Sequence, residues 1–246
     1  MIKLREISKR FDETPVLTGM DLDIHDGDTL VIMGKSGCGK SVTLKLMLRL
    51  LYPDEGEIII DDESIFDISE REMMEVRKKI GMLFQGGALF DSMTVWQNLA
   101  FAMLEHTDIP VHEIDELIRD LLQFVDMNGS QGKFPSELSG GMQKRVALAR
   151  ALIMTPDYVF FDEPTTGLDP VTAGMINKLI VRTREEYGVT SVVVTHDIVS
   201  ALSVGTKFAF LNEGRISFYG NRTDLRETDN PALREFLKDA SWQDRY

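Results

Sequence analysis

The chain of 246 residues has a single cysteine, Cys38, and no continuous apolar run of about 18 residues. One cysteine cannot form an intrachain disulfide, which fits a protein of a reducing cytosol. Without a long apolar run, the chain has no candidate for a transmembrane helix. Charged residues near the start also interrupt any secretion signal there. We therefore expect a cytoplasmic protein.

Basic residues are in the minority, because 27 Lys and Arg stand against 40 Asp and Glu, for a net charge of −13. That balance disfavours direct binding of nucleic acid or anionic lipid, so any membrane contact should pass through a partner protein. Internal repeats and low-complexity linkers are also lacking. With 43% hydrophobic residues, the chain can bury the core of one large α/β domain.

One complete motif is present at residues 34–41, which read GKSGCGKS and fit G-x-x-x-x-G-K-[ST], the loop that holds nucleotide phosphates. The flanks predict a buried strand at 28–33 and an apolar helix at 41–51, which is the order that the motif requires. Lys40 would reach the β- and γ-phosphates and Ser41 would ligate Mg²⁺, whereas the alternative is a flexible glycine turn. The predicted nucleotide-binding residues are Gly34, Lys35, Ser36, Gly37, Cys38, Gly39, Lys40, Ser41 and Val42.

A second candidate site follows the apolar residues 158–161, where Asp162 and Glu163 stand together. The pattern predicts a buried strand that ends in two acids, and ligands of parallel sheets bind beyond such strand ends. Asp162 would hold Mg²⁺ directly or through water, and Glu163 would be the catalytic base for the water that attacks the γ-phosphate. Acidic pairs also end ordinary strands, so this prediction depends on the glycine loop.

Residues 138–142 read LSGGM and precede a segment of helical periodicity at 143–152. A glycine-rich helix start is another potential anion site, although one nucleotide needs no second site in the same chain. With this motif the chain resembles the ATP-binding-cassette (ABC) ATPases over nearly its whole length. The resemblance implies a homodimer in which Ser139, Gly140 and Gly141 of one copy close over the ATP held by the other.

The resemblance supplies further expectations. Gln85, after the strand-like residues 80–84, would couple the γ-phosphate and Mg²⁺ to a membrane partner, and 167–169 would cross the dimer interface. His196, which also follows a strand-like segment, would contact the γ-phosphate; a lone histidine there would otherwise be structural. Phe11 would stack on adenine or else be buried in a small core. Catalysis is thus expected from Lys40, Gln85, Glu163 and His196, with Mg²⁺ held by Ser41, Gln85 and Asp162.

The family implies an α/β fold of the P-loop NTPase type, with a mixed or parallel core sheet flanked by helices, an antiparallel β subdomain and an inserted helical subdomain. We place the ATPase domain at 1–227 and the helical subdomain at about 86–155. Alternation of apolar residues predicts antiparallel strands at 2–7, 16–24 and 57–61.

Local signals predict several helices. The spacing of Ser69 and Glu72 fits a capping box before Gln85. Another helix is expected to open at 94–98, and residues 111–126 form an amphipathic stretch.

Residues 228–246 are predicted to be a C-terminal helical extension. Pro231 suits a first helical turn, after which Leu233, Phe236 and Leu237 share one face. Because so short a helix is marginal in water, this face must pack on something. The candidates are its own domain and the second subunit of the dimer that the ABC resemblance implies.

Residues 85–100 and 105–107 resemble the matching segments of ATPases from Mla/Mce-type lipid transporters, as does Met142 in place of the usual Gln. The apolar residues of this region would suit a groove for a permease helix, or else make turn and core contacts. They are Leu89, Phe90, Val95 and Trp96.

The Mla/Mce resemblance implies a complex of two ATPase copies, two copies of an MlaE-like permease and an Mce-domain lipid-binding protein. The ATPase would then be peripheral on the cytoplasmic face of the inner membrane. Three alternatives remain: the ATPase of another ABC transporter such as an amino-acid importer, a soluble cassette ATPase acting on nucleic acid or ribosomes, and a regulatory binding module. Intact Lys40, Glu163 and His196 argue against the last.

Overall fold

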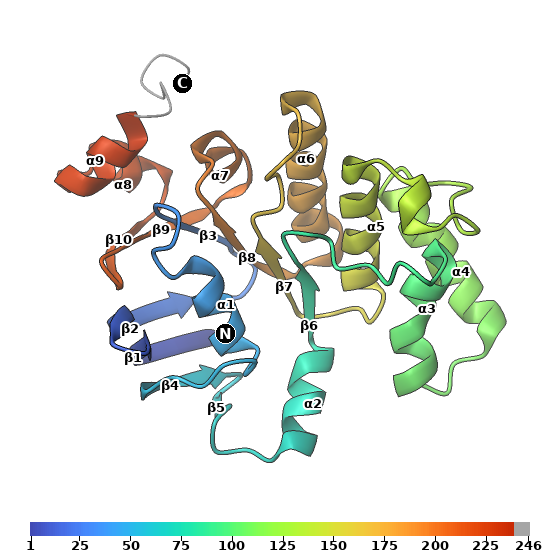
Figure 1. The fold of residues 1–246 in the computed structure, drawn as a ribbon, viewed down its shortest axis with the longest axis horizontal. Helices are drawn as coiled ribbons and strands as arrows, with labels where there is room; N and C mark the ends of the chain where they lie inside the picture. Colours follow the sequence, from blue (N-terminus) through green and yellow to red (C-terminus); the bar gives the residue numbers. More distant parts are fainter. Residues whose placement is uncertain (239–246) are drawn as a thin grey trace. The chain divides into compact units, whose positions relative to one another are not determined.

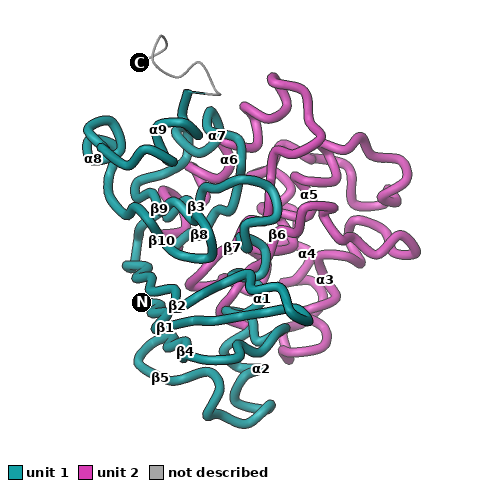
Figure 2. The backbone as a smooth tube through the Cα atoms, turned by 60° about the vertical axis from the view of Figure 1, so that its left-hand side comes forward, with its two compact units in different colours: residues 1–77, 190–246 teal, residues 78–189 magenta. Residues whose placement is uncertain are grey.

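The computed structural model describes residues 1–238, which form two compact units. Unit 1 combines residues 1–77 with the chain from residue 190 onward, and unit 2 is residues 78–189 (Figure 2). Within the described residues, no helix is both long enough and apolar enough to span a bilayer. The α/β fold expected from the sequence is confirmed in its mixed sheets and flanking helices.

Unit 1 contains an antiparallel sheet, as predicted, whose neighbouring strands lie side by side in Figure 1. Ile2 on its central strand is paired with Ile24 on one side and Ile60 on the other. These isoleucines are buried, because alternate side chains of each strand face the core. The strand order is β2-β1-β4-β5, with β1 at Ile2–Phe11, β2 at Thr14–Ile24, β4 at Glu55–Ile60 and β5 at Glu63–Ser64.

The second sheet of unit 1 is built around a fully buried strand, which pairs with a parallel strand on each side. Val31 lies opposite Val193 on one side and Phe208 on the other. The sheet is mixed because its edge strand returns by a tight hairpin. The order is β10-β9-β3-β8, with β3 at Thr29–Met33, β8 at Thr190–Thr195, β9 at Lys207–Asn212 and β10 at Arg215–Gly220.

The helices of unit 1 flank these strands and include the one that follows the glycine loop. That helix ends at Met47, four residues earlier than the sequence suggests, because Arg49 adopts a left-handed backbone with φ 49°. The amides of Arg49 and Leu50 bond back to Leu46 and Lys45, which closes a Schellman motif. The helices are α1 (Lys40–Met47), α2 (Glu70–Lys78), α7 (Ile198–Val204), α8 (Arg222–Glu227) and α9 (Pro231–Lys238).

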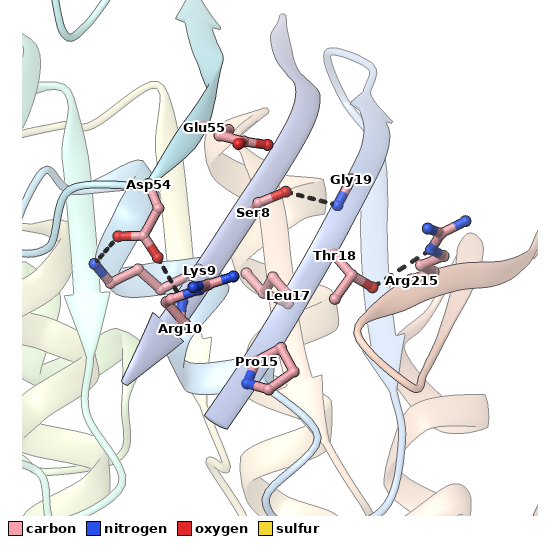
Figure 3. Close-up of a pocket in the computed structure, with 10 residues that line it drawn as sticks. All are labelled: Ser8, Lys9, Arg10, Pro15, Leu17, Thr18, Gly19, Asp54, Glu55 and Arg215. Atoms are coloured by element: carbon pink, nitrogen blue, oxygen red, sulfur yellow. Dashed lines mark hydrogen bonds and ion pairs between the residues drawn. The ribbon is translucent and has the colours of Figure 1, made fainter. Parts of the chain in front are cut away.

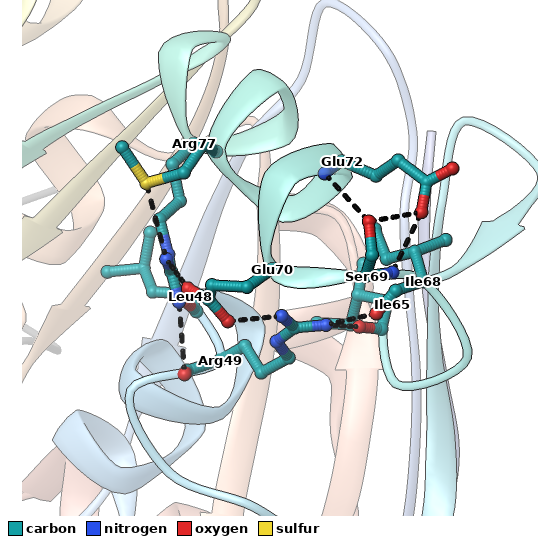
Figure 4. A network of polar contacts seen from close by, with 9 residues as sticks. Leu48, Arg49, Ile65, Ile68, Ser69, Glu70, Glu72 and Arg77 are labelled. Atoms are coloured by element: carbon teal, nitrogen blue, oxygen red, sulfur yellow. Dashed lines mark hydrogen bonds and ion pairs between the residues drawn. The ribbon is translucent and has the colours of Figure 1, made fainter.

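Arg49, which is itself buried, is the centre of a polar network that joins the end of α1 to the exposed Glu70 of α2 (Figure 4). Its guanidinium donates to the carbonyls of Ile65 and Ile68, each at 2.8 Å, and to the Glu70 carboxylate at 2.5 Å. Arg77 donates to the same carboxylate at 2.5 Å. A bidentate carboxylate between two guanidinium groups fixes the start of α2, so this helix is held by charge as well as by packing.

The start of α2 confirms the predicted capping box. Glu72 accepts from the Ser69 amide at 2.8 Å, and the Glu72 amide donates to the Ser69 hydroxyl at 3.3 Å. These reciprocal bonds satisfy backbone donors that a helix N-terminus otherwise leaves unpaired.

Unit 2 pairs two parallel strands, with Leu83 opposite Phe161, and surrounds them with helices. The third helix begins at the predicted place, because Thr94 and Gln97 form a capping box. Gly81 lets the strand approach its neighbouring helix, since a Cβ there would lie 2.2 Å from the Ala151 carbonyl oxygen. The elements are β6 (Ile80–Leu83), α3 (Val95–His106), α4 (Val111–Phe124), η1 (Pro135–Glu137), α5 (Gly140–Leu152), β7 (Tyr158–Asp162) and α6 (Pro170–Tyr187).

The described part of the C-terminal extension packs on its own unit. Leu233, Phe236 and Leu237 of α9 are buried. The ring of Phe236 lies against Phe210 of β9, with centroids 5.2 Å apart. The apolar face of α9 is therefore covered within unit 1, whereas the predicted tail at 239–246 lies outside the described residues.

Candidate functional site

The glycine loop of unit 1 lies between β3 and α1, in the predicted order. Lys40 is 6% exposed, and its amino group donates to the carbonyls of Gly34 at 2.8 Å and Lys35 at 3.1 Å. The loop therefore wraps around this amino group. Gly37 and Gly39 have φ of 80° and 109°, conformations that residues with a Cβ rarely adopt.

Two close approaches explain the outer glycines of the loop. A Cβ on Gly34 would lie 2.5 Å from the Leu211 carbonyl oxygen and 2.6 Å from the Cys38 sulfur. A Cβ on Gly39 would lie 2.9 Å from the Leu17 side chain. The antiparallel sheet thus reaches the loop through β2, and neither Gly34 nor Gly39 has room for a side chain.

His196 is placed beside the glycine loop by strand register. Met33 of β3 is opposite Thr195 of β8, so the next residues, Gly34 and His196, leave the same edge of the sheet together. The turn is fixed because Asp197 caps α7, accepting from the Val199 amide at 3.0 Å and the Ser200 hydroxyl at 2.6 Å. The exposed His196 side chain starts from this anchored turn.

Phe11 ends β1 and is 43% exposed, with the Lys9 ammonium 5.7 Å from its ring centroid. That exposure contradicts the alternative of a small core around Phe11. A ring on the surface leaves a face available for stacking.

A pocket of about 570 Å³ opens on the same sheet (Figure 3). Two of its charged side chains pair with each other, because Asp54 accepts a hydrogen bond from the Lys9 ammonium at 2.9 Å. Asp54 also accepts from the Arg10 amide at 2.6 Å. None of the predicted motif residues lines it, so we do not include it in the site. The lining residues are Ser8, Lys9, Arg10, Pro15, Leu17, Thr18, Gly19, Asp54, Glu55 and Arg215.

In unit 2, Gln85 and Glu163 occupy equivalent places beyond two neighbouring strands. Leu83 is opposite Phe161 in the parallel pair, and each predicted residue follows two positions later. Asp162 and Glu163 are 7% and 8% exposed. Buried carboxylates at the carboxyl ends of parallel strands are suited to metal and phosphate chemistry.

The LSGG segment forms the start of α5, as predicted. Ser139 is the cap, its hydroxyl accepting from the Met142 amide at 3.3 Å, and both Ser139 and Gly140 are exposed. Gly141 is buried, and the position has no room for a side chain, because a Cβ there would lie 2.4 Å from the Thr172 methyl group. The helix start can therefore present exposed backbone donors while its inner side packs on α6.

The predicted interface loop at 167–169 is anchored at its end. Asp169 caps α6, accepting from the amides of Val171 at 3.0 Å and Thr172 at 3.1 Å and from the Thr172 hydroxyl at 2.5 Å. The Thr172 hydroxyl bond is the main cause that holds the pKa of Asp169 below its usual range, and the amides add to it.

Two basic residues of α5 bind the segment after Gln85, which sequence reasoning missed. Arg150 donates to the carbonyls of Ala88 at 2.7 Å and Gly87 at 3.1 Å, and Lys144 donates to the Gln85 carbonyl. The sequence holds no local signal for these contacts, because α5 also carries Arg145, which bonds elsewhere.

Each predicted Mg²⁺ ligand has the side-chain chemistry of a residue that binds the ion together with a nucleotide. Among the described residues, no cluster of three or more His, Cys, Asp or Glu side chains forms a metal cage. Mg²⁺ in nucleotide sites uses one or two protein oxygens and the substrate phosphates, for which Ser41, Gln85 and Asp162 have the right chemistry.

A family model described as ABC transporter matches residues 17–166. This chain belongs to the ABC transporter ATPases. The ATPase is 38% identical to the intermembrane phospholipid transport system ATP-binding protein MlaF of Haemophilus influenzae, over 98% of this chain and 91% of that protein. It is 39% identical to the probable ribonucleotide transport ATP-binding protein mkl of Mycobacterium leprae, over 96% and 68%. A dimeric cassette solved in a post-hydrolysis state with ADP and Pi superposes with a TM-score of 0.82, 33% identity and coverage of 90% and 98%.

Proposed function

We propose that this ATPase is the motor of a lipid transporter of the Mla/Mce type. The observation that carries the proposal is the similarity to MlaF at 38% identity over nearly both full chains. The segment after Gln85 supports it, because it exposes the ring of Phe90 and leaves Leu89 and Trp96 partly exposed, as contact with a permease helix would require. The cargo would be phospholipid or another lipid, handled by the membrane partners.

That surface is built by a buried amide. Asn98 is 1% exposed and accepts from the Phe90 amide at 2.8 Å while donating to the carbonyls of Phe90, Met93 and Thr94 at 3.0–3.1 Å. The saturated amide folds residues 90–94 into a fixed turn. The turn presents Phe90, which is 45% exposed, next to another exposed ring of α3.

The predicted permease groove needs one correction. Val95, the first residue of α3, has no exposed surface. The segment around Lys133 lies against it, since the Val95 amide bonds to the Lys133 carbonyl at 2.8 Å. Phe101, 41% exposed, takes its place: its ring lies 5.4 Å from that of Phe90. Leu104, one turn on, is 49% exposed.

We infer the following catalytic roles for a homodimer. Lys40 and the loop amides bind the β- and γ-phosphates, and Phe11 stacks on adenine. Ser139, Gly140 and Gly141 of the second copy close over the same nucleotide. Mg²⁺, held by Ser41, Gln85 and Asp162, would neutralise phosphate charge. Glu163 accepts a proton from the attacking water, and His196 hydrogen-bonds the γ-phosphate.

Isolation of the membrane complex tests the transport class. The tagged ATPase should copurify with an MlaE-like permease and an Mce-domain protein, and extracted lipid should be found with the complex. A Phe90→Asp and Phe101→Asp variant should lose the permease while the exposed control Val171→Asp, on α6, keeps it. Copurification of an amino-acid permease with a soluble binding protein would overturn the lipid assignment.

A second cargo has one observation in its favour, since the mkl relative is named for ribonucleotide transport. The same purification separates the two, because nucleotide rather than lipid would then accompany the complex. In both cases the ATPase would lie on the cytoplasmic face of the inner membrane, held by its permease, without binding nucleic acid directly.

A further inference from the structure

Lys144 lies inside unit 2, on the face of α5 that packs against the β6 side. The residue is 6% exposed, and its amino group donates a hydrogen bond to the backbone carbonyl of Gln85. Gln85 lies within a turn that is closed by a 2.8 Å bond from the Gly87 amide to the Phe84 carbonyl. Lys144 therefore contacts the backbone at the point where β6 ends and the Gln85 segment starts.

The charges of Asp162, the predicted Mg²⁺ ligand, and Glu163, the predicted base, also act on this amino group. Burial lowers the pKa of Lys144, while the charges of Asp162 and Glu163 oppose that shift. A buried ammonium is stable only when hydrogen bonds and opposite charge compensate its lost hydration. Gln85 supplies the hydrogen bond here, and the two carboxylates supply the charge.

We propose that Lys144 is a positioning residue for ATP hydrolysis, which ties the Gln85 segment to the Asp162 and Glu163 carboxylates. The charge of the ammonium offsets those of the two acids, and its hydrogen bond fixes the backbone from which the Gln85 side chain projects. Movement of the segment after Gln85 withdraws the acceptor of Lys144 and so changes the field at the catalytic base. The proposal rests on the roles proposed above for Gln85 and Glu163.

The linkage gives a physical route from a permease to the chemistry. Phe90, on the proposed permease surface, lies five residues after Gln85. Arg150, which is on α5 like Lys144, donates to the carbonyls of Gly87 and Ala88 between them. Arg150 stabilises the turn, whereas Lys144 alone of the two is coupled to the carboxylates. A force on the turn would therefore reach the base through Lys144.

Three variants of the full-length protein test this inference. Lys144→Met keeps the length of the side chain without its charge, and Lys144→Arg restores a cation. Arg145→Met is the matched control, because Arg145 is the next residue of α5 but donates to the Val125 and Asp126 carbonyls at 3.4 and 3.0 Å. Steady-state kcat and KM for ATP are measured, together with hydrogen–deuterium exchange of residues 84–90 in the nucleotide-free protein.

Lys144→Met should lower kcat by about ten- to a hundredfold while KM changes by less than about threefold, because ATP is bound by other residues. Exchange at residues 84–90 should become faster. Lys144→Arg should recover most of the kcat, and Arg145→Met should change neither readout.

Two results would overturn the inference: unchanged exchange at 84–90 in Lys144→Met, or faster exchange with unchanged kcat. If Lys144→Met does not fold, Lys144→Arg decides. A kcat and an exchange rate like those of wild type would support a cation-dependent role. A low kcat together with fast exchange would oppose it. The exchange measurement needs no catalysis, so it remains informative even if Glu163 is not the base.

Discussion

The hydroxyl of Thr166 donates a hydrogen bond of 3.1 Å to Oε2 of Glu163. Glu163 also has a left-handed backbone with φ 48°, which a residue with a long side chain rarely adopts. Such a conformation persists only where the surrounding structure enforces it, and it is commonest at functional sites. The carboxylate is therefore aimed by its own backbone and by Thr166 together.

Glu163→Gln should retain ATP binding and lose turnover by about 10²- to 10⁴-fold, because the amide keeps the shape but cannot accept the proton. The dimer should persist with ATP trapped inside. Single-turnover hydrolysis and nucleotide occupancy measure both effects.

Thr166→Val is the matched control, since it leaves the carboxylate but removes the bond that aims it. It should lower kcat less than Glu163→Gln does. Hydrolysis by Glu163→Gln within a few-fold of wild type would remove Glu163 from the role of base.

Mixed dimers test the composite site. Lys40→Ala removes a cation from the phosphates, whereas Ser139→Ala changes the residue that closes over the ATP of the opposite copy. Each variant alone should be inactive. A heterodimer of the two should regain activity, because it contains one intact site.

Nucleotide occupancy supplies the control for the mixed dimer. A heterodimer that binds ATP at its intact site but does not hydrolyse it would show that the two sites must act together. Failure to bind at that site would contradict the two-copy arrangement.

The Arg49, Glu70 and Arg77 network predicts a pH-dependent stability. The hydrogen bond from Arg77, followed by that from Arg49, holds the pKa of Glu70 below its ordinary value of 4.5. A carboxyl whose folded pKa is depressed stabilises the fold above the unfolded pKa, and this contribution is lost as the pH falls through the folded pKa. Glu70→Gln should therefore melt at a lower temperature than wild type at pH 7.

The difference between Glu70→Gln and wild type should shrink as the pH falls below 4.5, because the wild-type carboxyl is then also neutral. Thermal melting over this range measures it. Glu63→Gln, which replaces an exposed carboxyl on β5, is the control and should melt like wild type at pH 7. A difference that stays constant down to pH 3 would contradict the ion-pair explanation.

The packing of α9 predicts an effect on folding. Phe236→Ala should lower the free energy of unfolding by about 3 kcal/mol, because it removes a buried ring that packs on Phe210. Urea denaturation measures the loss. The exposed neighbour Glu235→Ala should have little effect.

Truncation separates the described helix from the tail beyond it. Deleting 239–246 leaves α9 in place, so any loss of dimer assembly would be caused by the tail itself. Sedimentation of this protein with ATP tests that contribution. A dimer of unchanged stability would show that the tail does not reach the second copy in a way that matters for assembly.

Features that depend on neighbours in the chain could be read from the sequence alone. The glycine loop, the capping box of α2, the start of α3 and the buried strand that ends at Asp162 all follow from local spacing. Local spacing decides them because a phosphate loop, a helix cap or a strand end needs residues within a few positions of one another.

Contacts between distant segments were decided only by the tertiary structure. Periodicity marks Phe236 as buried but cannot say that Phe210 covers it, and it gives no sign that Lys144 reaches the Gln85 carbonyl. It also cannot show that the Arg49 side chain, in the turn that ends α1, bonds to residues more than fifteen positions away. A sequence pattern specifies which side of an element is buried, whereas packing of the whole chain selects the partner.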